Sequence, residues 1–339
     1  MDFKEFTAGK DDDGRRFDRV LRIFLPDLKL NDIYKLIRKG LVKINQKKAK
    51  PDTHINQGDI ISIADFLLNN HSALNKGSTP ASLDNNNNNP KDSKNHSAPE
   101  LNVIFENQHL LIIDKPYGIS VHGSENNKKD YLAKEVSLYY EKHKKDTSNA
   151  SLSFRPGPLH RLDRNTSGLL VFSMSLEGAK WFSAAIKNHT IQKKYYGLAE
   201  GKLDKTEMWE DKLADSTDTD EVFHTVTANQ MGQTALTIAK PLACGKLENK
   251  AVTLVEYEIK TGRKHQICAQ SKLHGHPLAG DKAYGGHPCK SLKREYFLQA
   301  FCLNFPAENP LGLPPQVKMG LSPDFLQLLE CCEIKNPGL

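Results

Sequence analysis

Residues 160–171 read His160-Arg161-Leu162-Asp163-Arg164-Asn165-Thr166-Ser167-Gly168-Leu169-Leu170-Val171, and this stretch indicates the fold of the chain more clearly than any other. A carboxylate lies between two arginines, and a Thr-Ser-Gly turn then leads into an apolar strand. The flanking cations favour the ionised form of Asp163, which suits a nucleophile or a base. A salt bridge within a loop is the alternative, and these residues alone do not establish a reaction.

Short apolar runs typical of β-strands lie on both sides of this stretch. They are Leu101–Phe105, Leu110–Ile113, Gly168–Ser173, Tyr195–Ala199, Phe223–Ala228, Thr234–Ile238 and Val252–Ile259. A helix is expected from Ser175 to about His189, because Ala179, Phe182 and Ile186 share one helical face. Strands outnumber helices, so we predict an α+β domain over residues 101–330, with a mixed, mainly antiparallel sheet and flanking helices.

The N-terminal part of the chain is strongly basic. Residues 14–50 hold twelve lysines and arginines against three acids, a net charge of +9, whereas the whole chain carries +6. Such a concentration of positive charge predicts binding to RNA, and an ordinary solvated surface is the alternative. The candidate RNA-binding residues of this region are Arg15, Arg19, Lys35, Arg38, Lys39, Lys43 and Lys47.

The apolar residues of this basic region predict a small α/β domain over residues 14–63. Four of them, spaced i, i+3, i+4 and i+7 from Phe17, predict a first helix. A second helix is bounded by Asn31 as its N-cap and Gly40 as its C-cap. Two strand-like runs follow, at Leu41–Ile44 and Asp59–Ile63.

Two segments differ in composition from these predicted domains. Residues 64–100 are rich in Asn, Ser, Lys and Pro, show no apolar period, and are predicted to form a flexible linker. Residues 203–221 hold eight acids and two lysines, so we predict an acidic loop that does not touch RNA.

The composition limits the class of protein. With 339 residues, 38% hydrophobic and 26% charged, the chain is long enough for about two globular domains. No apolar run approaches the roughly 18 residues of a membrane span, and the N-terminus lacks the order of a signal peptide. The six cysteines form no C-x-x-C pair, so we expect a reducing, cytoplasmic setting and no membrane partner.

Neither a metal nor a nucleotide cofactor is predicted. His265, Cys268, His274 and His276 lie close together in the sequence, but no second cluster of zinc ligands accompanies them. The sequence also contains neither a G-x-G-x-x-G motif nor a G-x-x-x-x-G-K-[ST] phosphate loop.

Residues 160–171 resemble the signature of the RluA-type pseudouridine synthase family, H-R-L-D-R-x-T-S-G-L-L, and match it without a gap. The resemblance spans about residues 100–306, and the order of elements in residues 14–63 resembles the S-four type RNA-binding domain. The other segments that carry these two resemblances are Asp114–Gly118 with Val121-His122, Lys193-Lys194-Tyr195, Thr261–Ile267, Gly275–Leu278 with Gly280-Asp281, and the N-terminal run Gly40–Asn45.

The resemblance implies the pseudouridine synthase fold and isomerisation of uridine to pseudouridine within RNA, without a cofactor. It implies that Asp163 is the catalytic carboxylate, that Tyr195 stacks on the flipped base and assists the final proton removal, and that Arg161 fills the gap left in the RNA. Whether Asp163 attacks the ribose, attacks the base or removes a ribose proton stays open. The RNA contacts expected around this site are His160, Arg161, Arg164, Arg263, His265 and Gln266.

The appended basic module implies a particular substrate by analogy. Family members that act on short tRNA stem-loops often lack such a module, so we expect ribosomal RNA of the large subunit, or its precursor, as the partner. We further expect the protein to act as a monomer.

One position departs from the family pattern. The late motif usually continues Gln-Ile-Arg, and that arginine pairs with the catalytic aspartate, but this chain has Cys268 there. We expect activity to survive through compensation by Arg164, Arg263 or Lys264. The alternative is a catalytically weak or inactive RNA-binding ribosome-assembly factor on the same scaffold. A carboxylate-based hydrolase is a third reading, which requires a second catalytic acid that the sequence does not place.

Overall fold

The structure is a computed structural model, and it describes residues 2–25, 27–68, 101–123, 131–143, 151–216, 225–289 and 294–334. The chain divides into two compact units. The N-terminal unit comprises Met1–Pro99 together with Leu138–Arg155 and Ser175–Glu177, and the second unit comprises the remaining residues. In the described ranges, none of the helices has the length and apolar character needed to cross a membrane.

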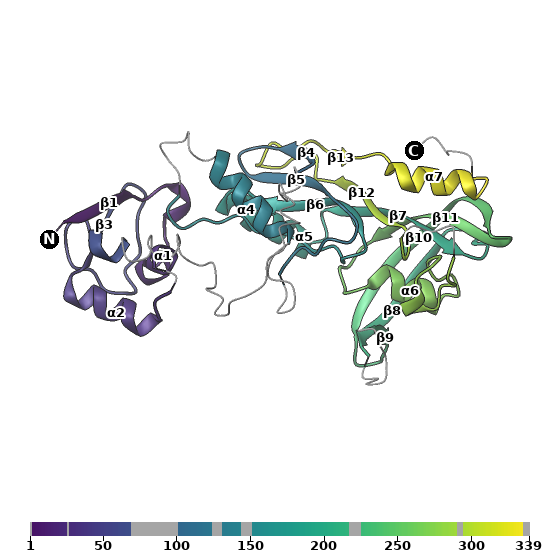
Figure 1. Ribbon diagram of the computed structural model, residues 1–339, viewed down its shortest axis with the longest axis horizontal. Coiled ribbons are helices and arrows are strands. Elements are labelled where there is room, and N and C mark those ends of the chain that lie inside the picture. Colours follow the sequence, from purple (N-terminus) through teal and green to yellow (C-terminus); the bar gives the residue numbers. More distant parts are fainter. Residues whose placement is uncertain are drawn as a thin grey trace, which may run out of the picture. The chain divides into compact units, whose positions relative to one another are not determined.

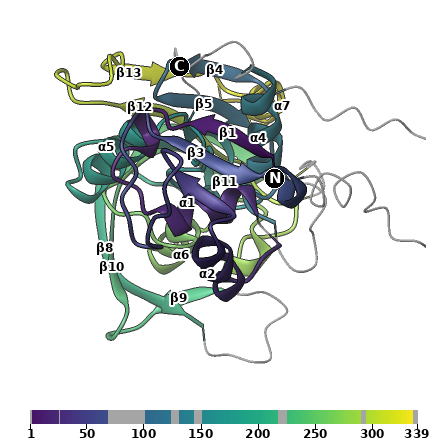
Figure 2. The ribbon, with the colours of Figure 1, turned by 90° about the vertical axis from the view of Figure 1, so that its left-hand side faces the viewer.

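The N-terminal unit contains a three-stranded antiparallel sheet with two helices beside it (Figure 2). The strands, in sheet order, are β1 (Phe3–Thr7), β3 (Ile60–Ala64) and β2 (Val42–Ile44). The helices are α1 (Phe17–Phe24), α2 (Leu30–Lys39) and the short 3-10 helix η1 (Lys10–Asp12). Their apolar faces enclose one buried cluster, which confirms the two predicted helices and the two strands that follow them.

Two details of this unit differ from prediction. β1 was not predicted, because its apolar residues Phe3 and Phe6 are three apart and lack the alternation of a strand. The N-cap of α2 is Lys29, which is extended, so the prediction of Asn31 as N-cap was wrong. The predicted cap at the other end is confirmed, because Gly40 is left-handed with φ +72° and its N–H bonds the last turn of α2.

Asp12 joins residues 151–153 to this unit. Its carboxylate accepts hydrogen bonds from the Gly9 N–H and from three consecutive residues, including 2.8 Å bonds from the Ser151 hydroxyl and the Leu152 N–H. Burial alone would raise the pKa of Asp12, but the hydrogen bonds from Ser153, Leu152 and Ser151 hold it below its usual value. The ionised carboxylate therefore fastens a segment distant in the sequence onto the N-terminal module.

The second unit is built on a ten-stranded sheet (Figure 1). In sheet order the strands are β4 (Val103–Glu106), β5 (Leu110–Lys115), β6 (Ser167–Ser173), β12 (Leu298–Asn304), β7 (Gln192–Glu200), β11 (Lys250–Ile259), β10 (Gln233–Leu247), β8 (Glu207–Asp215) and β9 (Val226–Ala228), with β13 (Gln316–Lys318) beside β12. Among the described pairs, only β6 and β12 run parallel. The predicted α+β class with a mixed, mainly antiparallel sheet is confirmed.

The helices of this unit cover separate parts of the sheet. α5 (Leu176–Lys187) confirms the predicted helix, and its Phe182 packs on β5 and β6. α7 (Pro323–Cys331) packs Phe325 against β7, β11 and β12. Also present are α4 (Leu132–His143), α6 (Gln266–Leu273) and the 3-10 helix η3 (Lys282–Tyr284).

Two predicted segments have different outcomes. The prediction of an acidic loop over residues 203–221 was wrong for Glu207–Asp215, because β8 forms there and pairs with β10 in the sheet. Residues 217–221 of that stretch lie outside the described residues. Most of the predicted linker, residues 69–100, also lies outside them, and β3 continues to Ala64.

Gly168 allows the parallel pairing that carries the loop of residues 160–167 into the middle of the sheet. It begins the pairing of β6 with β12, where it lies opposite Ala300. Its φ is +103°, and a Cβ there would lie 2.1 Å from the Ala300 carbonyl oxygen. Because only glycine fits, β6 approaches β12 closely and Asp163 is held beside the strands of the sheet centre.

Candidate active site

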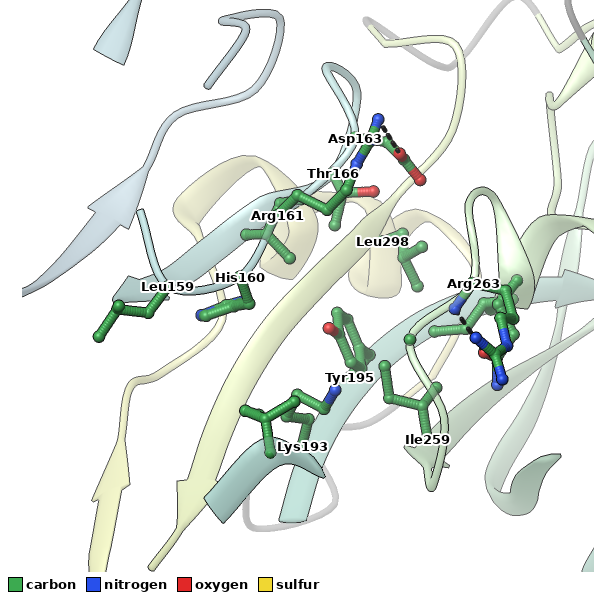
Figure 3. A pocket seen from close by; sticks show the side chains of 15 residues that line it. Leu159, His160, Arg161, Asp163, Thr166, Lys193, Tyr195, Ile259, Arg263 and Leu298 are labelled. Carbon is green, nitrogen blue, oxygen red and sulfur yellow. Dashed lines mark hydrogen bonds and ion pairs between the residues drawn. The ribbon is translucent and has the colours of Figure 1, made fainter. Parts of the chain in front are cut away.

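Three segments far apart in the sequence line one cavity of about 230 Å³ (Figure 3). They are the loop 159–166, the start of β7, and the end of β11 with the turn that leads into α6. The structure therefore brings together Asp163, Arg161, Tyr195 and Arg263, which the sequence predicted as site residues. Leu298 of β12 also lines the cavity and was not predicted, because the sequence does not show which strand lies next to β7.

Asp163 lies where two cationic or potentially cationic groups approach one carboxylate oxygen. Its Oδ1 is 4.0 Å from Nη2 of Arg161 and 3.8 Å from Nε2 of His265, and its side chain is 20% exposed. The Thr166 N–H donates to the Asp163 carbonyl at 3.0 Å and closes the turn that presents the carboxylate. Asp163 is therefore partly shielded from solvent and still reachable from the cavity.

Lys115 holds the loop of residues 159–166 in place through hydrogen bonds, a role that the sequence analysis did not predict. Its buried ammonium donates to the carbonyl oxygens of Arg164 at 3.0 Å and Pro116 at 2.9 Å. Burial lowers the pKa of Lys115 to about 8, although the Asp163 carboxylate opposes this shift. The family resemblance marked this lysine in the sequence, but only the fold shows that it clamps the residue after Asp163.

His265 is held by a hydrogen-bond chain that orients it toward Asp163. The Tyr284 hydroxyl accepts the Val226 N–H at 2.9 Å and lies 2.9 Å from Nδ1 of His265. A hydroxyl that donates to Nδ1 leaves the proton of the neutral imidazole on Nε2, the nitrogen that faces Asp163. Burial lowers the pKa of His265, while the Asp163 carboxylate acts in the opposite direction.

Tyr195 forms one wall of the cavity. It is 5% exposed, and the aliphatic side chains of Ile259 and Leu298 line the cavity with it (Figure 3). Burial, and then the Asp163 carboxylate, raise the pKa of Tyr195, so the phenol stays neutral and is a poor base. A ring flanked by apolar side chains suits the stacking of a flat, uncharged base.

Two predicted RNA contacts support the fold instead. Gln266 is buried, and its amide makes four hydrogen bonds, to Thr261, the Arg263 N–H, Leu236 and Thr237, which uses its full capacity. Gln266 therefore has no group left for RNA, which corrects that expectation.

His160 likewise faces the interior. Its Nε2 accepts the Val171 N–H at 3.1 Å, and its ring stacks on Phe182. Burial lowers the pKa of His160 to about 3, so this residue is a neutral support of the loop 159–166 and not a cation for RNA.

The expected replacement of the missing arginine is not seen. Arg164 donates to the Gly118 carbonyl, Arg263 donates to the Thr234 carbonyl and Gln233, and Lys264 pairs with Asp215. In the described structure the groups within 4.0 Å of the Asp163 carboxylate are those of Arg161 and His265.

A second cavity, of about 250 Å³, lies on the other side of Asp163. Asp281, Tyr284 and Tyr296 line it, and the buried Cys268 lies beside Asp281. Burial raises the pKa of Asp281 to about 6, and its Oδ2 has no hydrogen-bond partner among the described residues. The family pattern has an arginine at position 268. Here that position is Cys268, so among the described residues the neighbouring Asp281 carboxylate has no cationic partner.

The other two members of the group His265, Cys268, His274 and His276 have different partners. His274 lies 3.1 Å from Asp211, and His276 hydrogen bonds the Glu200 carbonyl. Over the described ranges, no group of three or more His, Cys, Asp and Glu side chains is arranged to hold a metal ion.

The basic residues of the N-terminal unit fall into two groups. Arg15 donates to the carbonyl and hydroxyl oxygens of Ser153, Lys35 pairs with Asp32, and the Lys43 ammonium lies 4.4 Å from the Phe3 ring centroid. The remaining candidates are exposed, and their side chains have no such partner among the described residues: Arg19, Arg38, Lys39 and Lys47. The four exposed cations are therefore the better candidates for binding the phosphates of RNA.

Two protein-family models and several known proteins match this chain. The family model for RNA pseudouridylate synthase matches residues 109–272, and that for the S4 domain matches residues 15–61. Ribosomal large subunit pseudouridine synthase C of Vibrio cholerae is 28% identical over 299 residues, covering 86% of this chain and 83% of that protein. The protein of the same name from Buchnera aphidicola is 30% identical over 275 residues, covering 80% and 77%.

A solved structure confirms the predicted fold. Human RNA pseudouridylate synthase domain containing 4 superposes with a TM-score of 0.54 at 20% sequence identity, covering 70% of this chain and 94% of that chain.

Proposed function

The chain belongs to the RNA pseudouridylate synthase family and is therefore an isomerase that acts on RNA, and we propose that it converts specific uridines of large-subunit ribosomal RNA to pseudouridine with Asp163 as the catalytic carboxylate. The observation that carries this proposal is the position of Asp163 at the mouth of a cavity walled by Tyr195 and aliphatic side chains. A flipped uracil placed against Tyr195 has its ribose beside Asp163.

Different residues around the cavity hold the base, fill the gap in the RNA and orient the carboxylate. Tyr195, Ile259 and Leu298 hold the base, so that it is retained while its bond to the ribose is broken. Arg161, with a side chain that is 67% exposed, lies at the rim and is free to enter the gap in the RNA stack. His265 and Arg161 lie within 4.0 Å of the Asp163 carboxylate and are placed to orient it.

The substrate assignment rests on the relatives and on the basic module. Two relatives are named for the large ribosomal subunit, and they align over most of their length with this chain. The exposed cations of the N-terminal unit add binding to RNA outside the modified base. We further propose that the protein acts as a monomer in the cytoplasm, where ribosomal RNA is modified.

Pseudouridine mapping tests the proposal. RNA from cells with and without the protein is treated with carbodiimide and read by primer extension. Loss of stops at defined uridines of large-subunit RNA is the expected result. An unchanged map with RNA binding intact would favour the alternative, an inactive ribosome-assembly factor on the same scaffold.

Replacement of the carboxylate tests the assigned role of Asp163. Asp163→Asn keeps the shape of the side chain and removes its charge, so we expect turnover to be abolished while RNA affinity stays within about three-fold. Both are measured on the purified protein, by release of tritium from C5-labelled uridine and by filter binding. Turnover that persists in this variant would remove Asp163 from the catalytic role.

A further inference from the structure

Lys193 is a buried cation that faces the base cavity. It lies on β7 two residues before Tyr195, and side chains alternate along a strand, so both side chains line the same cavity (Figure 3). Lys194, between them, projects from the other face and pairs with Glu256 at 3.0 Å. Lys193 is only 8% exposed, which is unusual for a lysine.

No contact within the described part of the chain accounts for this ammonium group. Lys193 has neither a hydrogen-bond acceptor nor a carboxylate partner there, and burial is what lowers its pKa. Burying an unpaired charge is costly, so a group of this kind is retained where a bound ligand supplies the acceptor. Space exists beside it, because a Cβ added to Gly262 would lie 3.5 Å from the Lys193 Nζ.

The walls of the cavity indicate which acceptor is supplied. Leu159, Ile186 and Ile259 line the same cavity as Lys193 with apolar side chains, which suit a flat base and not a charged phosphate. Arg161 and Arg263 also line the cavity and are exposed, so they are the residues there that suit contact with phosphates of the RNA backbone. A uracil held against Tyr195 offers two carbonyl oxygens as its only strong acceptors inside the cavity.

We propose that Lys193 donates a hydrogen bond to a carbonyl oxygen of the flipped uracil and stabilises the negative charge that the base carries when it leaves the ribose. This inference rests on the proposed pseudouridine synthase activity. When the C1′–N1 bond breaks, its electron pair stays with the uracil and spreads onto the carbonyl oxygens. The uracil anion supplies the electron pair of the new C5–C1′ bond, the proton on C5 then passes to solvent, and N1 takes up one proton from solvent, so the base is neutral again. Lys193 takes part as a donor throughout and is itself unchanged.

The first test compares Lys193→Met with Lys194→Met. Both variants lose one ammonium from the same strand, but only the first loses it from the cavity. Single-turnover rates are measured by tritium release from large-subunit ribosomal RNA transcribed with C5-labelled uridine. We expect Lys193→Met to slow this step about 100-fold with RNA affinity within about three-fold, and Lys194→Met to stay within about three-fold of the natural protein.

The second test changes the leaving group. In RNA transcribed with 5-fluorouridine, the fluorine itself stabilises the uracil anion, so the step depends less on Lys193. C5 of this base carries fluorine and has no proton to lose, so the rearranged base instead takes up water at C6. This nucleoside is measured by mass spectrometry after nuclease digestion, and rates of Lys193→Met and the natural protein are compared on each RNA. We expect the 100-fold loss to shrink to less than about ten-fold on the fluorinated RNA.

Three other outcomes have distinct meanings. A Lys193→Met rate within three-fold of the natural protein overturns the inference. So does an equal loss on both RNAs, because a lysine that merely packs the cavity is indifferent to the leaving group. A natural protein that is inactive on uridine-containing RNA overturns the proposed function itself, before any variant is compared.

Discussion

At the scale of single residues, the site is organised around one carboxylate and the groups that replace an absent arginine. Asp163 has Arg161 and His265 within 4.0 Å, and the Tyr284 hydroxyl fixes the imidazole from behind. Cys268, buried beside Asp281, occupies the position of the family's arginine. His265 is therefore the residue that we expect to take over part of the orienting role of the arginine in the family pattern.

A double-mutant cycle tests this exchange of roles. His265→Asn accepts the left-handed backbone at this position (φ +49°) and removes the group that faces Asp163, so we expect the single-turnover rate to fall about 10- to 100-fold. In a Cys268→Arg background, the new guanidinium supplies the orienting charge, and the loss should be about ten-fold smaller. His274→Asn is the control, because His274 lies at the other end of α6 against Asp211. Equal losses in both backgrounds would contradict the exchange.

Asp281 predicts a specific dependence of stability on pH. Burial raises its pKa from the ordinary 3.8 to about 6, so the folded state favours the protonated acid. The stability due to this group is present below about pH 4 and is lost as the pH rises toward 6, an effect of up to about 3 kcal/mol.

Asp281→Asn removes this titration. The free energy of unfolding of the variant, relative to the natural protein, should therefore rise between pH 4 and pH 7, as measured by urea titration at several pH values. A difference that stays constant over this range would show that Asp281 does not titrate as described.

At the scale of elements, the geometry of the site depends on hydrogen bonds that fix its loops to the neighbouring strands and helices. Lys115 at the end of β5 holds the loop that precedes β6, and Gln266 at the start of α6 holds the turn after β11. The two ties are polar and buried, so each fixes a loop in one conformation. The parallel contact of β6 with β12 then sets the distance between the loop and Tyr195 on β7.

Gly168→Ala tests the importance of that contact. The added methyl group would overlap the Ala300 carbonyl at a backbone φ of +103°, so we expect a loss of at least about 3 kcal/mol of stability. Both tryptophans, Trp181 and Trp209, belong to the second unit, so their fluorescence during urea unfolding reports on that unit alone. Gly157→Ala is the control, because no atom lies within 4 Å of its added Cβ, and it should cost less than about 1 kcal/mol. Similar costs for both variants would contradict the argument.

At the scale of the whole molecule, charge is divided between the two units. Residues 14–50 carry +9, whereas the chain as a whole carries +6, so the remainder is slightly acidic. We therefore expect the exposed cations of α1 and α2 to bind RNA while the second unit performs the chemistry on one base. The ties from Asp12 to Ser151 and Ser153 mean that the basic module includes chain that lies between β5 and β6 in the sequence.

Neutralising the basic face tests this division. The triple change Arg19→Gln, Arg38→Gln and Lys39→Gln should weaken RNA binding and reduce the slope of log affinity against log salt by about 2 to 3. Salt titrations by filter binding measure both effects. The control removes three exposed lysines from the second unit, Lys212, Lys240 and Lys246, with the same change in net charge. Equal effects of the two triple changes would show that net charge, and not the basic face, governs binding.

Much of the architecture follows from local sequence pattern. The helices α1, α2 and α5 and the strands of the large sheet from β4 to β7 have the apolar spacing of their type, and Gly40 marks a helix end through its left-handed conformation. β1, β8 and β12 were not predicted, because pairing with partners distant in the sequence stabilises them more than their own residues do.

The sequence by itself identified the family and the carboxylate, because the motif around Asp163 is contiguous and its chemistry depends on residue type. Which neighbours surround that carboxylate was decided by the tertiary structure alone. The hydrogen-bonding groups of Gln266 and His160 are satisfied within the protein, whereas Lys193 faces the base cavity and His265 faces the second cavity beside Asp163. These orientations depend on strand register and on burial among several separate segments of the chain, and such contacts leave no signal in local spacing.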